Sequence, residues 1–311
     1  MPSFATEVKN ELARLMYEKE CCRTAELAAL LRMGAAMTIG AHHALGLNFT
    51  TENAAVARKT LMLLKDTGEV HTEVTVSRSR RLKKNNSYCV RVVPSPKVSV
   101  LLERLGLMHG DSLNMGTDSA ILRRQCCRAA YLRGAFQGGG SVNRPESDYH
   151  LELVTGSYPF AELLLNLMRR MGLPAGITDR KDAYLVYLKE GDAVIDFLGM
   201  LQADKAVEDF EVARNLKEVR NQVNRLVNCE TANLQKTVDA AGRQIQEIHQ
   251  LQAAGRLQGL APALLQAAEA RLAHPDATLS ELAELLQVGK SGINHRLRKL
   301  SKLAQELTEG E

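Results

Sequence analysis

Residues 21–34 read CCRTAELAALLRMG, and residues 126–139 read CCRAAYLRGAFQGG. The second stretch repeats the first at an offset of 105 residues, with the same three residues at its start and a glycine at its end. One copy is too long to be the unit of a solenoid repeat. The duplication therefore indicates two related lobes in one pseudo-symmetric domain.

The repeat continues beyond these two stretches. Residues 64–68 (LKDTG) are echoed by residues 168–172 (MRRMG), and residues 87–92 (SYCVRV) by residues 183–188 (AYLVYL). Apolar residues at helical spacing alternate with segments of period-two alternation, such as Val70 to Val76, which is typical of a half-buried strand. Each lobe is expected to run helix, strands, helix, strands, helix, so the fold class is α+β with antiparallel sheets.

Small residues lie along both copies of the repeated stretch. They allow two helix backbones to approach closely, as at the interface of a pseudo-dimer. We therefore expect the two helices to pack against each other. The small residues are Ala28, Ala29 and Gly34 in the first copy, and Gly134, Gly138 and Gly139 in the second.

The chain has 311 residues, 45% of them hydrophobic and 24% charged, which is ordinary for a globular protein. No stretch is long and apolar enough for a membrane span. Charged residues near the start, including Lys9 and Arg14, argue against a signal peptide. We predict lobes at about 1–107 and 108–210, a helical linker at 211–255 and a further domain at 256–311.

The net charge is only +4, so contacts with nucleic acid have to come from local clusters. Two basic clusters lie on separate predicted elements, which makes double-stranded DNA the expected partner. The first surrounds a predicted β-hairpin, with a turn at Asn85 and Asn86, and contains Arg78, Arg80, Arg81, Lys83 and Lys84. The second lies in a stretch without acidic residues and contains Lys290, Arg296, Arg298, Lys299 and Lys302.

The second cluster belongs to a predicted helix-turn-helix. Pro262 begins the first helix, a TLSE capping box at residues 278–281 begins the second, and Gln287 to Gly289 form the turn. The third helix buries Ile293, Leu297 and Leu300 at spacings of four and three. Its outward face would enter the major groove with Lys290, Ser291, Asn294, His295 and Arg298.

Roles on this third helix follow from side-chain chemistry. Asn294 suits a bidentate pair with adenine, and Arg298 or Lys290 a guanine or a phosphate. Arg296, Lys299 and Lys302 are expected to grip backbone phosphates. His295 either contacts DNA or is solvated, and a basic helix that only packs in a helical hairpin is the alternative to the whole motif.

None of the six cysteines has CxxC spacing. Adjacent cysteines are poor partners for each other or for one tetrahedral zinc ion. Reduced thiols packed as small apolar residues are therefore the favoured interpretation, and no metal site is predicted. A metal site across the lobes that uses both pairs, Cys21–Cys22 and Cys126–Cys127, is the alternative.

Residues 132–140 (LRGAFQGGG) resemble the signature helix of LAGLIDADG homing endonucleases, and residues 27–35 are a weaker copy. The resemblance implies two adjacent helices beneath a saddle of antiparallel strands that sits on duplex DNA. Catalysis in that family needs an acidic metal ligand near the end of each helix. The matching positions here are Gly34 and Gly139, which cannot bind a metal ion. Glu26 and Asp148 are expected to be surface charges, so no catalytic residue and no cofactor are predicted.

The whole chain resembles the WhiA family of bacterial transcriptional regulators. The resemblance is carried by residues 82–86 (LKKNN), 131–142 (YLRGAFQGGGSV), 224–233 (NRLVNCETAN) and 290–299 (KSGINHRLRK). It implies a degenerate LAGLIDADG-like domain followed by a helix-turn-helix. The implied function is sequence-specific DNA binding that governs sporulation, cell division and chromosome segregation, in the cytoplasm at the nucleoid.

Two alternatives remain open. The first is a LAGLIDADG-type nuclease, which shares the duplicated lobes but lacks their ligands. The second is a regulator whose lobes are a platform for another regulatory protein, with DNA contact confined to residues 256–311. No membrane partner is expected.

Overall fold

The structure is a computed structural model that describes residues 2–68, 70–78, 86–110, 112–114 and 120–308. These residues form two compact units that divide between Lys217 and Glu218. The units have separate hydrophobic cores. None of the described helices combines the length and the apolar character that crossing a membrane requires.

The first lobe begins with two helices and continues through a four-stranded antiparallel sheet, with the strand order β1-β2-β4-β3. A short 3₁₀ turn, η1 (Ala41–His43), connects its first two strands. The other elements, in chain order, are α1 (Phe4–Arg14), α2 (Glu20–Gly34), β1 (Ala35–Ile39), β2 (Leu45–Thr51), α3 (Ala54–Asp66), β3 (Thr72–Arg78), β4 (Asn86–Val92), α4 (Pro96–Arg104), β5 (Met108–His109) and β6 (Ser112–Leu113).

The second lobe repeats this plan, and its sheet has the equivalent order β7-β8-β10-β9. The predicted α+β class with antiparallel sheets and two related lobes is confirmed. The elements of this lobe are α5 (Gln125–Gly139), β7 (Gly140–Val142), β8 (Leu151–Thr155), α6 (Tyr158–Arg170), β9 (Gly176–Arg180), β10 (Ala183–Leu188) and α7 (Gly191–Met200).

The sequence echoes coincide with equivalent structural positions. Gly68 and Gly172 follow α3 and α6, and both have positive φ angles, +67° and +87°. Glycine is favoured there because a side chain strains a left-handed backbone. The echo between residues 87–92 and residues 183–188 falls on β4 and β10, the second strand from the edge in each sheet.

Strand β3 differs from its prediction. The alternation from Val70 to Val76 predicts a half-buried strand, but Val74 and Val76 are exposed. The reason is position, because β3 is an edge strand and, among the described strands, pairs with β4 alone. Asn86 also differs, since it pairs with Arg78 in the β3–β4 ladder and so does not form the predicted turn.

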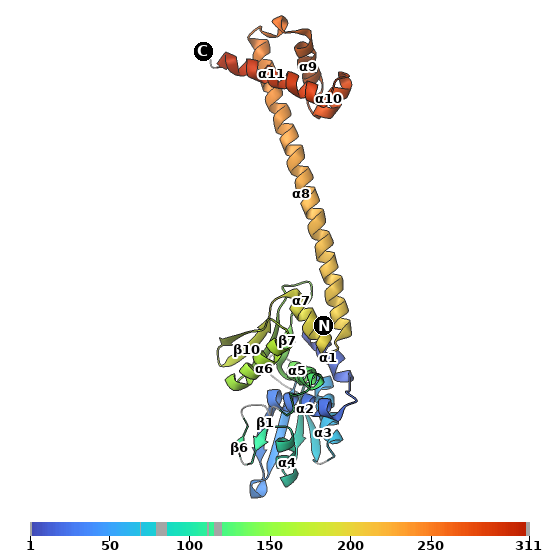
Figure 1. The fold of residues 1–311 in the computed structure, drawn as a ribbon, viewed down its shortest axis with the longest axis vertical. Helices are drawn as coiled ribbons and strands as arrows, with labels where there is room; N and C mark the ends of the chain where they lie inside the picture. Colours follow the sequence, from blue (N-terminus) through green and yellow to red (C-terminus); the bar gives the residue numbers. More distant parts are fainter. Residues whose placement is uncertain (1, 69, 79–85, 111, 115–119, 309–311) are drawn as a thin grey trace. The chain divides into compact units, whose positions relative to one another are not determined.

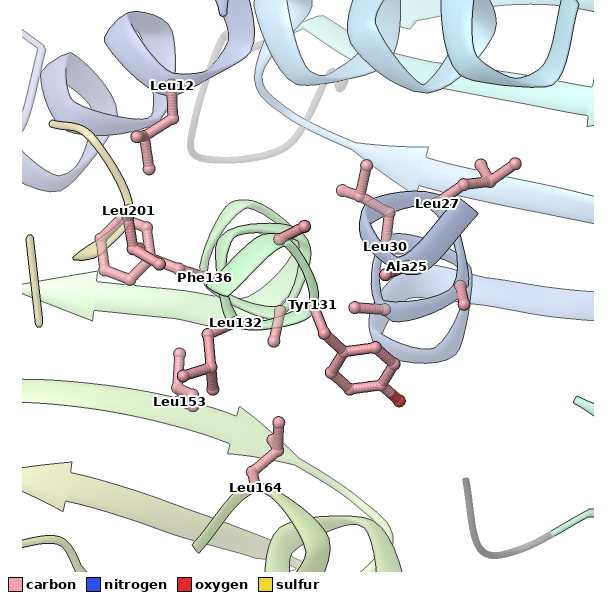
Figure 2. Packing of buried hydrophobic residues seen from close by; sticks show 14 of the residues in the cluster. Leu12, Ala25, Leu27, Leu30, Tyr131, Leu132, Phe136, Leu153, Leu164 and Leu201 are labelled. Carbon is pink, nitrogen blue, oxygen red and sulfur yellow. The ribbon is translucent and has the colours of Figure 1, made fainter. Parts of the chain in front are cut away.

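Helices α2 and α5 lie side by side at the centre of the N-terminal unit (Figure 1). Figure 2 shows the apolar packing around them, with Leu27 and Leu30 on α2, Leu132 and Phe136 on α5, and Leu132 directed toward Leu153 of β8. The side chains of α2 and α5 belong to one core that continues through both lobes. The predicted helix pair is therefore the centre of the unit.

Close approach of these two helices depends on small residues, as predicted. A Cβ atom on Gly134 would lie 2.2 Å from the backbone oxygen of Glu26, and one on Gly138 would lie 2.5 Å from Cβ of Met33. Both distances are shorter than real Cβ contacts. Any side chain at these positions would push the helices apart.

Helix α8 (Asp204–Ala253) includes the predicted boundary at 210 and nearly all of the predicted linker, 211–255. Phe210, in its first turns, packs against Phe4 with 5.6 Å between ring centroids. Ile248 and Leu251, near its end, belong to the core of the C-terminal unit. This unit continues through η2 (Leu257–Gly259), α9 (Pro262–Ala273), α10 (Leu279–Leu285) and α11 (Lys290–Thr308).

Candidate nucleic-acid interface

The C-terminal unit packs helices α9, α10 and α11 and the end of α8 around a small core. Ile293, Leu297 and Leu300 of α11 are buried, as their spacing predicts, and contribute to one cluster with residues of α8, α9 and α10. Ala283 of α10 is also buried, which fits its predicted place at a close helix crossing. The helix-turn-helix motif therefore forms from the predicted residues.

Local sequence determines where these helices begin. The Thr278 hydroxyl accepts a hydrogen bond from the Glu281 backbone N–H, and the Glu281 carboxylate accepts one of 2.7 Å from the Thr278 backbone N–H. The bond from the Thr278 backbone N–H to the carboxylate lowers the pKa of Glu281. Gln287 adopts a positive φ of 51° in the turn, and the Val288 N–H donates to the Ala283 oxygen. The second helix is thereby aligned with the third.

Arg271 is a structural residue that sequence analysis missed. Its side chain is almost fully buried, and it donates hydrogen bonds to the backbone oxygens of Pro275 and Ala277. These bonds hold the connection between α9 and α10. The signal was present in the sequence, because Arg271 continues the core spacing of Leu264 and Ala268.

Helix α11 carries all eight predicted contact residues. Asn294 and Arg296 are half-buried, and the other six are exposed. Steps of one, three, one and three residues bring Lys290, Ser291, Asn294, His295 and Arg298 to one side of the helix. The exposed residues are Lys290, Ser291, His295, Arg298, Lys299 and Lys302.

The predicted basic hairpin of the first lobe is described in part. Strands β3 and β4 form the hairpin, and Arg78 is exposed at the end of β3. Arg80, Arg81, Lys83 and Lys84 lie outside the described residues. On the neighbouring part of the sheet, the exposed residues Arg91 and Glu73 form an ion pair of 3.7 Å.

The two signature helices end at the predicted positions, since Gly34 is the last residue of α2 and Gly139 the last of α5. Both positions are sterically closed to a side chain. A Cβ atom on Gly34 would lie 2.7 Å from the Phe49 ring, and one on Gly139 would lie 2.3 Å from Cε of Met33 and 2.8 Å from the Val154 oxygen. In the described part of the chain, no acidic side chains near these helix ends are grouped to hold a metal ion.

Glu26 was predicted to be a surface charge, and this prediction is wrong. Its side chain is fully buried between the lobes, where it accepts a 2.8 Å hydrogen bond from Gln137 of α5 and pairs with buried Lys59 of α3 at 3.3 Å. Burial raises the pKa of Glu26, against the opposing charges of Lys59 and Arg133. Burial likewise lowers the pKa of Lys59. Asp148 is exposed, as predicted.

Arg133 completes this buried network. Its guanidinium stacks 4.0 Å over the Tyr17 ring and donates to the Leu201 backbone oxygen and the Gln202 side chain. These groups come from α5, from the segment after α1 and from the end of α7. The network fixes how the helix pair sits among its neighbours, and sequence reasoning missed it because no local pattern marks the partners.

The two cysteine pairs also meet between the lobes. The sulfur atoms of Cys21, Cys22, Cys126 and Cys127 all lie within 4.8 Å of one another. All four are free thiols, two of them buried and two half-buried. This convergence is what the alternative interpretation, a metal site across the lobes that uses both pairs, requires.

Three family models match the chain in succession. They are the WhiA N-terminal LAGLIDADG-like domain over residues 20–108, the WhiA LAGLIDADG-like domain over 128–220 and the WhiA C-terminal helix-turn-helix domain over 223–304. The matched ranges agree with the two lobes and the C-terminal helices described above.

Curated relatives match over nearly the whole chain. A protein of Desulforamulus reducens named probable cell division protein WhiA is 49% identical, with 99% of this chain and 97% of the relative covered. A protein of the same name from Brevibacillus brevis is 46% identical, with 99% and 98% covered.

Among solved structures, full-length WhiA from Thermotoga maritima matches with a TM-score of 0.62 and 22% identity, covering 98% of this chain and 99% of that chain. At this identity the likeness shows the fold alone. The relatives, by contrast, share almost half of their residues with this chain from end to end. This chain is therefore a member of the WhiA family.

Proposed function

We propose that this protein is a sequence-specific DNA-binding transcriptional regulator that acts in cell division, sporulation and chromosome segregation and does not cut DNA. The outward face of α11 is the observation that carries the proposal. Six exposed and two half-buried polar or basic side chains lie on the helix that a helix-turn-helix inserts into the major groove. Such a regulator would work in the cytoplasm, at the nucleoid.

The proposed face divides into two functions. The Asn294 amide offers one donor and one acceptor to a base edge, and the Arg298 guanidinium offers two donors. Each good bidentate pair discriminates by about 1–3 kcal/mol. Arg296, Lys299 and Lys302 supply positive charge that fixes the register on phosphates without reading the sequence. A regulator that selects an operator needs both.

Two substitutions separate these functions. Arg298→Ala should relax base preference at one operator position, by about 1–3 kcal/mol. Lys299→Ala should weaken binding to operator and random duplex alike and reduce the salt slope by about one unit. Lys236→Ala, which removes an exposed cation of α8, is the matched control.

The measurement is a salt-dependent titration of the full chain against operator and random duplexes. Unchanged affinity and unchanged specificity in both α11 variants would reject the assignment. Supercoiled plasmid incubated with the protein and Mg²⁺ or Mn²⁺ should stay intact, because Gly34 and Gly139 provide no ligand. Cleavage that disappears with EDTA would instead favour the nuclease alternative.

A second candidate function assigns the lobes to a regulatory protein partner. The exposed Val74 and Val76 of β3 favour it, because apolar side chains on a sheet edge suit protein contacts better than phosphates. Replacing Lys83 and Lys84 by Glu in the full chain tests this candidate. A large loss of DNA affinity would place DNA on the lobe, and no loss would favour the protein partner.

A further inference from the structure

The four sulfur atoms of Cys21, Cys22, Cys126 and Cys127, here called the thiol cluster, meet at the seam between the lobes. Their largest separation is within 4.8 Å. Within each adjacent pair, the two sulfur atoms are 4.0 Å apart. Across the residues that the structure describes, this is the one group of His, Cys, Asp or Glu side chains arranged to share a metal ion.

The separations fit one tetrahedral ion. A Zn–S bond of about 2.3 Å gives a tetrahedral S–S edge of about 3.8 Å. The within-pair distances of 4.0 Å are already close to this edge, and the longest separation has to shorten by at most about 1 Å. Adjacent cysteines are thus suitable ligands here, because each lobe supplies one pair and the repeat brings the two pairs together.

The charges around the thiol cluster suit an anionic complex. A zinc ion with four thiolates carries two negative charges. The ligands lie in the first turns of α2 and α5, and neither helix has a side-chain cap, so two positive helix ends meet at the cluster. Arg124 adds a cation, with its guanidinium nitrogen 3.7 Å from the Cys21 sulfur.

An ion could reach the cluster from solvent. Cys21 and Cys126 are half-buried, whereas Cys22 and Cys127 are buried. A surface pocket of about 420 Å³ is lined by Cys22 and Cys126, together with Tyr17 and Gln202. The pocket gives an ion a path to the cluster, and the buried thiols of Cys22 and Cys127 lie on the side away from solvent.

Other uses of the thiols fit less well. Fully buried packing would explain Cys22 and Cys127 but not the two half-buried thiols directed at the same point. A disulfide within one pair is excluded by geometry, because neighbouring Cα atoms of a helix are about 3.8 Å apart and a disulfide needs at least about 4.4 Å. Disulfides between the lobes remain the competing outcome for the experiment.

We propose that the thiol cluster is a structural Zn²⁺ site, in which one ion is bound by four thiolates, two from each lobe. The ion joins the N-terminal ends of α2 and α5 and lies on the pseudo-twofold axis that relates the lobes. It fixes the spacing of the two lobes at the end of the helix pair opposite to Gly34 and Gly139.

The test uses the full chain, reduced and freed of metal, and then supplied with Zn²⁺ or Co²⁺. About one Zn²⁺ should bind per chain, and Co²⁺ should give the intense visible and thiolate-to-metal absorption of a tetrahedral four-thiolate site. Cys21→Ser and Cys126→Ser, each at a half-buried position, should weaken Zn²⁺ binding by more than about 100-fold in a chelator competition. Cys229→Ser, at an exposed position on α8, should bind like the parent protein.

Three results would overturn the proposal. They are a reduced chain that takes up no Zn²⁺, equal binding in the Cys126→Ser and Cys229→Ser variants, or a Co²⁺ spectrum without thiolate charge-transfer bands. A chain isolated with disulfides between the lobes that takes up no Zn²⁺ after reduction would assign the cluster to redox chemistry. If a variant fails to fold, the Co²⁺ spectrum of the parent protein still shows whether the four thiolates bind the metal ion.

Discussion

Single residues decide what the seam between the lobes can do. Gly34 and Gly139 stand where the resemblance to the LAGLIDADG signature helix implies acidic ligands, and the structure adds that Phe49, Met33 and a backbone oxygen occupy the space a side chain would need. Both positions are therefore closed to an acidic side chain by the packing as well as by the residue type.

A substitution at Gly139 tests this steric closure. Gly139→Asp should lower the free energy of unfolding by about 1–3 kcal/mol, because the added atoms overpack the helix end. It should not create metal-dependent cleavage of plasmid DNA. Urea unfolding and a plasmid assay with Mg²⁺ measure the two outcomes, and Gly199→Asp is a control in an unobstructed position. Cleavage by Gly139→Asp would contradict the steric account.

The buried Glu26–Lys59 pair gives a prediction for stability. Lys59→Met should lower the free energy of unfolding by about 3–5 kcal/mol, because it leaves a buried carboxylate without its cation. The double variant Glu26→Gln/Lys59→Met should lose less, since the amide oxygen can still accept from Gln137 and neither charge of the pair is left. Urea unfolding of both variants at neutral pH measures this, and an equal loss would show that the pair's charge is unimportant.

The stability of the Lys59→Met variant should also depend on pH. Burial raises the pKa of Glu26 above its ordinary value of 4.5, and Lys59, which opposes the shift, is gone. Glu26 then binds a proton more readily in the folded state than in the unfolded state. The stability of the variant therefore falls as pH rises through the pKa of Glu26 in the folded protein, and this loss is absent below pH 4.5, where Glu26 is protonated in both states. The difference in unfolding free energy between variant and parent should therefore shrink as pH is lowered. A difference that is constant with pH would contradict the expectation.

At the scale of secondary-structure elements, helix caps and helical spacing gave more accurate predictions than the period-two alternation of a strand did. The capping box at Thr278 and the spacing of Ile293, Leu297 and Leu300 located α10 and α11, because both signals act within one or two helical turns. The alternation in β3 predicted a buried face that the strand does not have. Which face is covered depends on the neighbours of the strand, and β3 is at an edge.

Thr278→Ala measures what the cap contributes. The substitution removes a hydrogen bond to the Glu281 backbone N–H and should destabilise the C-terminal unit by about 1 kcal/mol. Ser280→Ala, at an exposed position inside the same helix, should have little effect. Thermal unfolding monitored by circular dichroism compares the two, and equal shifts would mean that the cap contributes nothing specific.

At the scale of the whole molecule, the chain has two cores in two units. Separate cores predict two unfolding transitions in calorimetry, since two-state behaviour belongs to single domains. Lys59→Met should shift one transition and Thr278→Ala the other. A single transition that both variants shift would show that the units unfold together.

Sequence alone determined the two-lobe plan, the helix pair and the helix-turn-helix with its outward residues. These features are repeated along the chain or specified by neighbouring residues, so they can be read without knowing the packing. The predictions for Glu26 and for β3 were wrong, because Glu26 is buried and β3 is exposed, and the role of Arg133 was missed. The meeting of the four thiols was only the alternative to packed thiols.

Only the tertiary structure decided those features, and one physical reason covers them. Each depends on neighbours that are distant in the sequence. Gln137 lies 111 positions from Glu26, the two cysteine pairs lie 105 positions apart, and the Arg133 partner Leu201 lies 68 positions away. The exposure of β3 depends on which strand ends the sheet. A cysteine pair or a glutamate has the same local sequence whether it faces solvent or the partner lobe, and burial alone changes its chemistry.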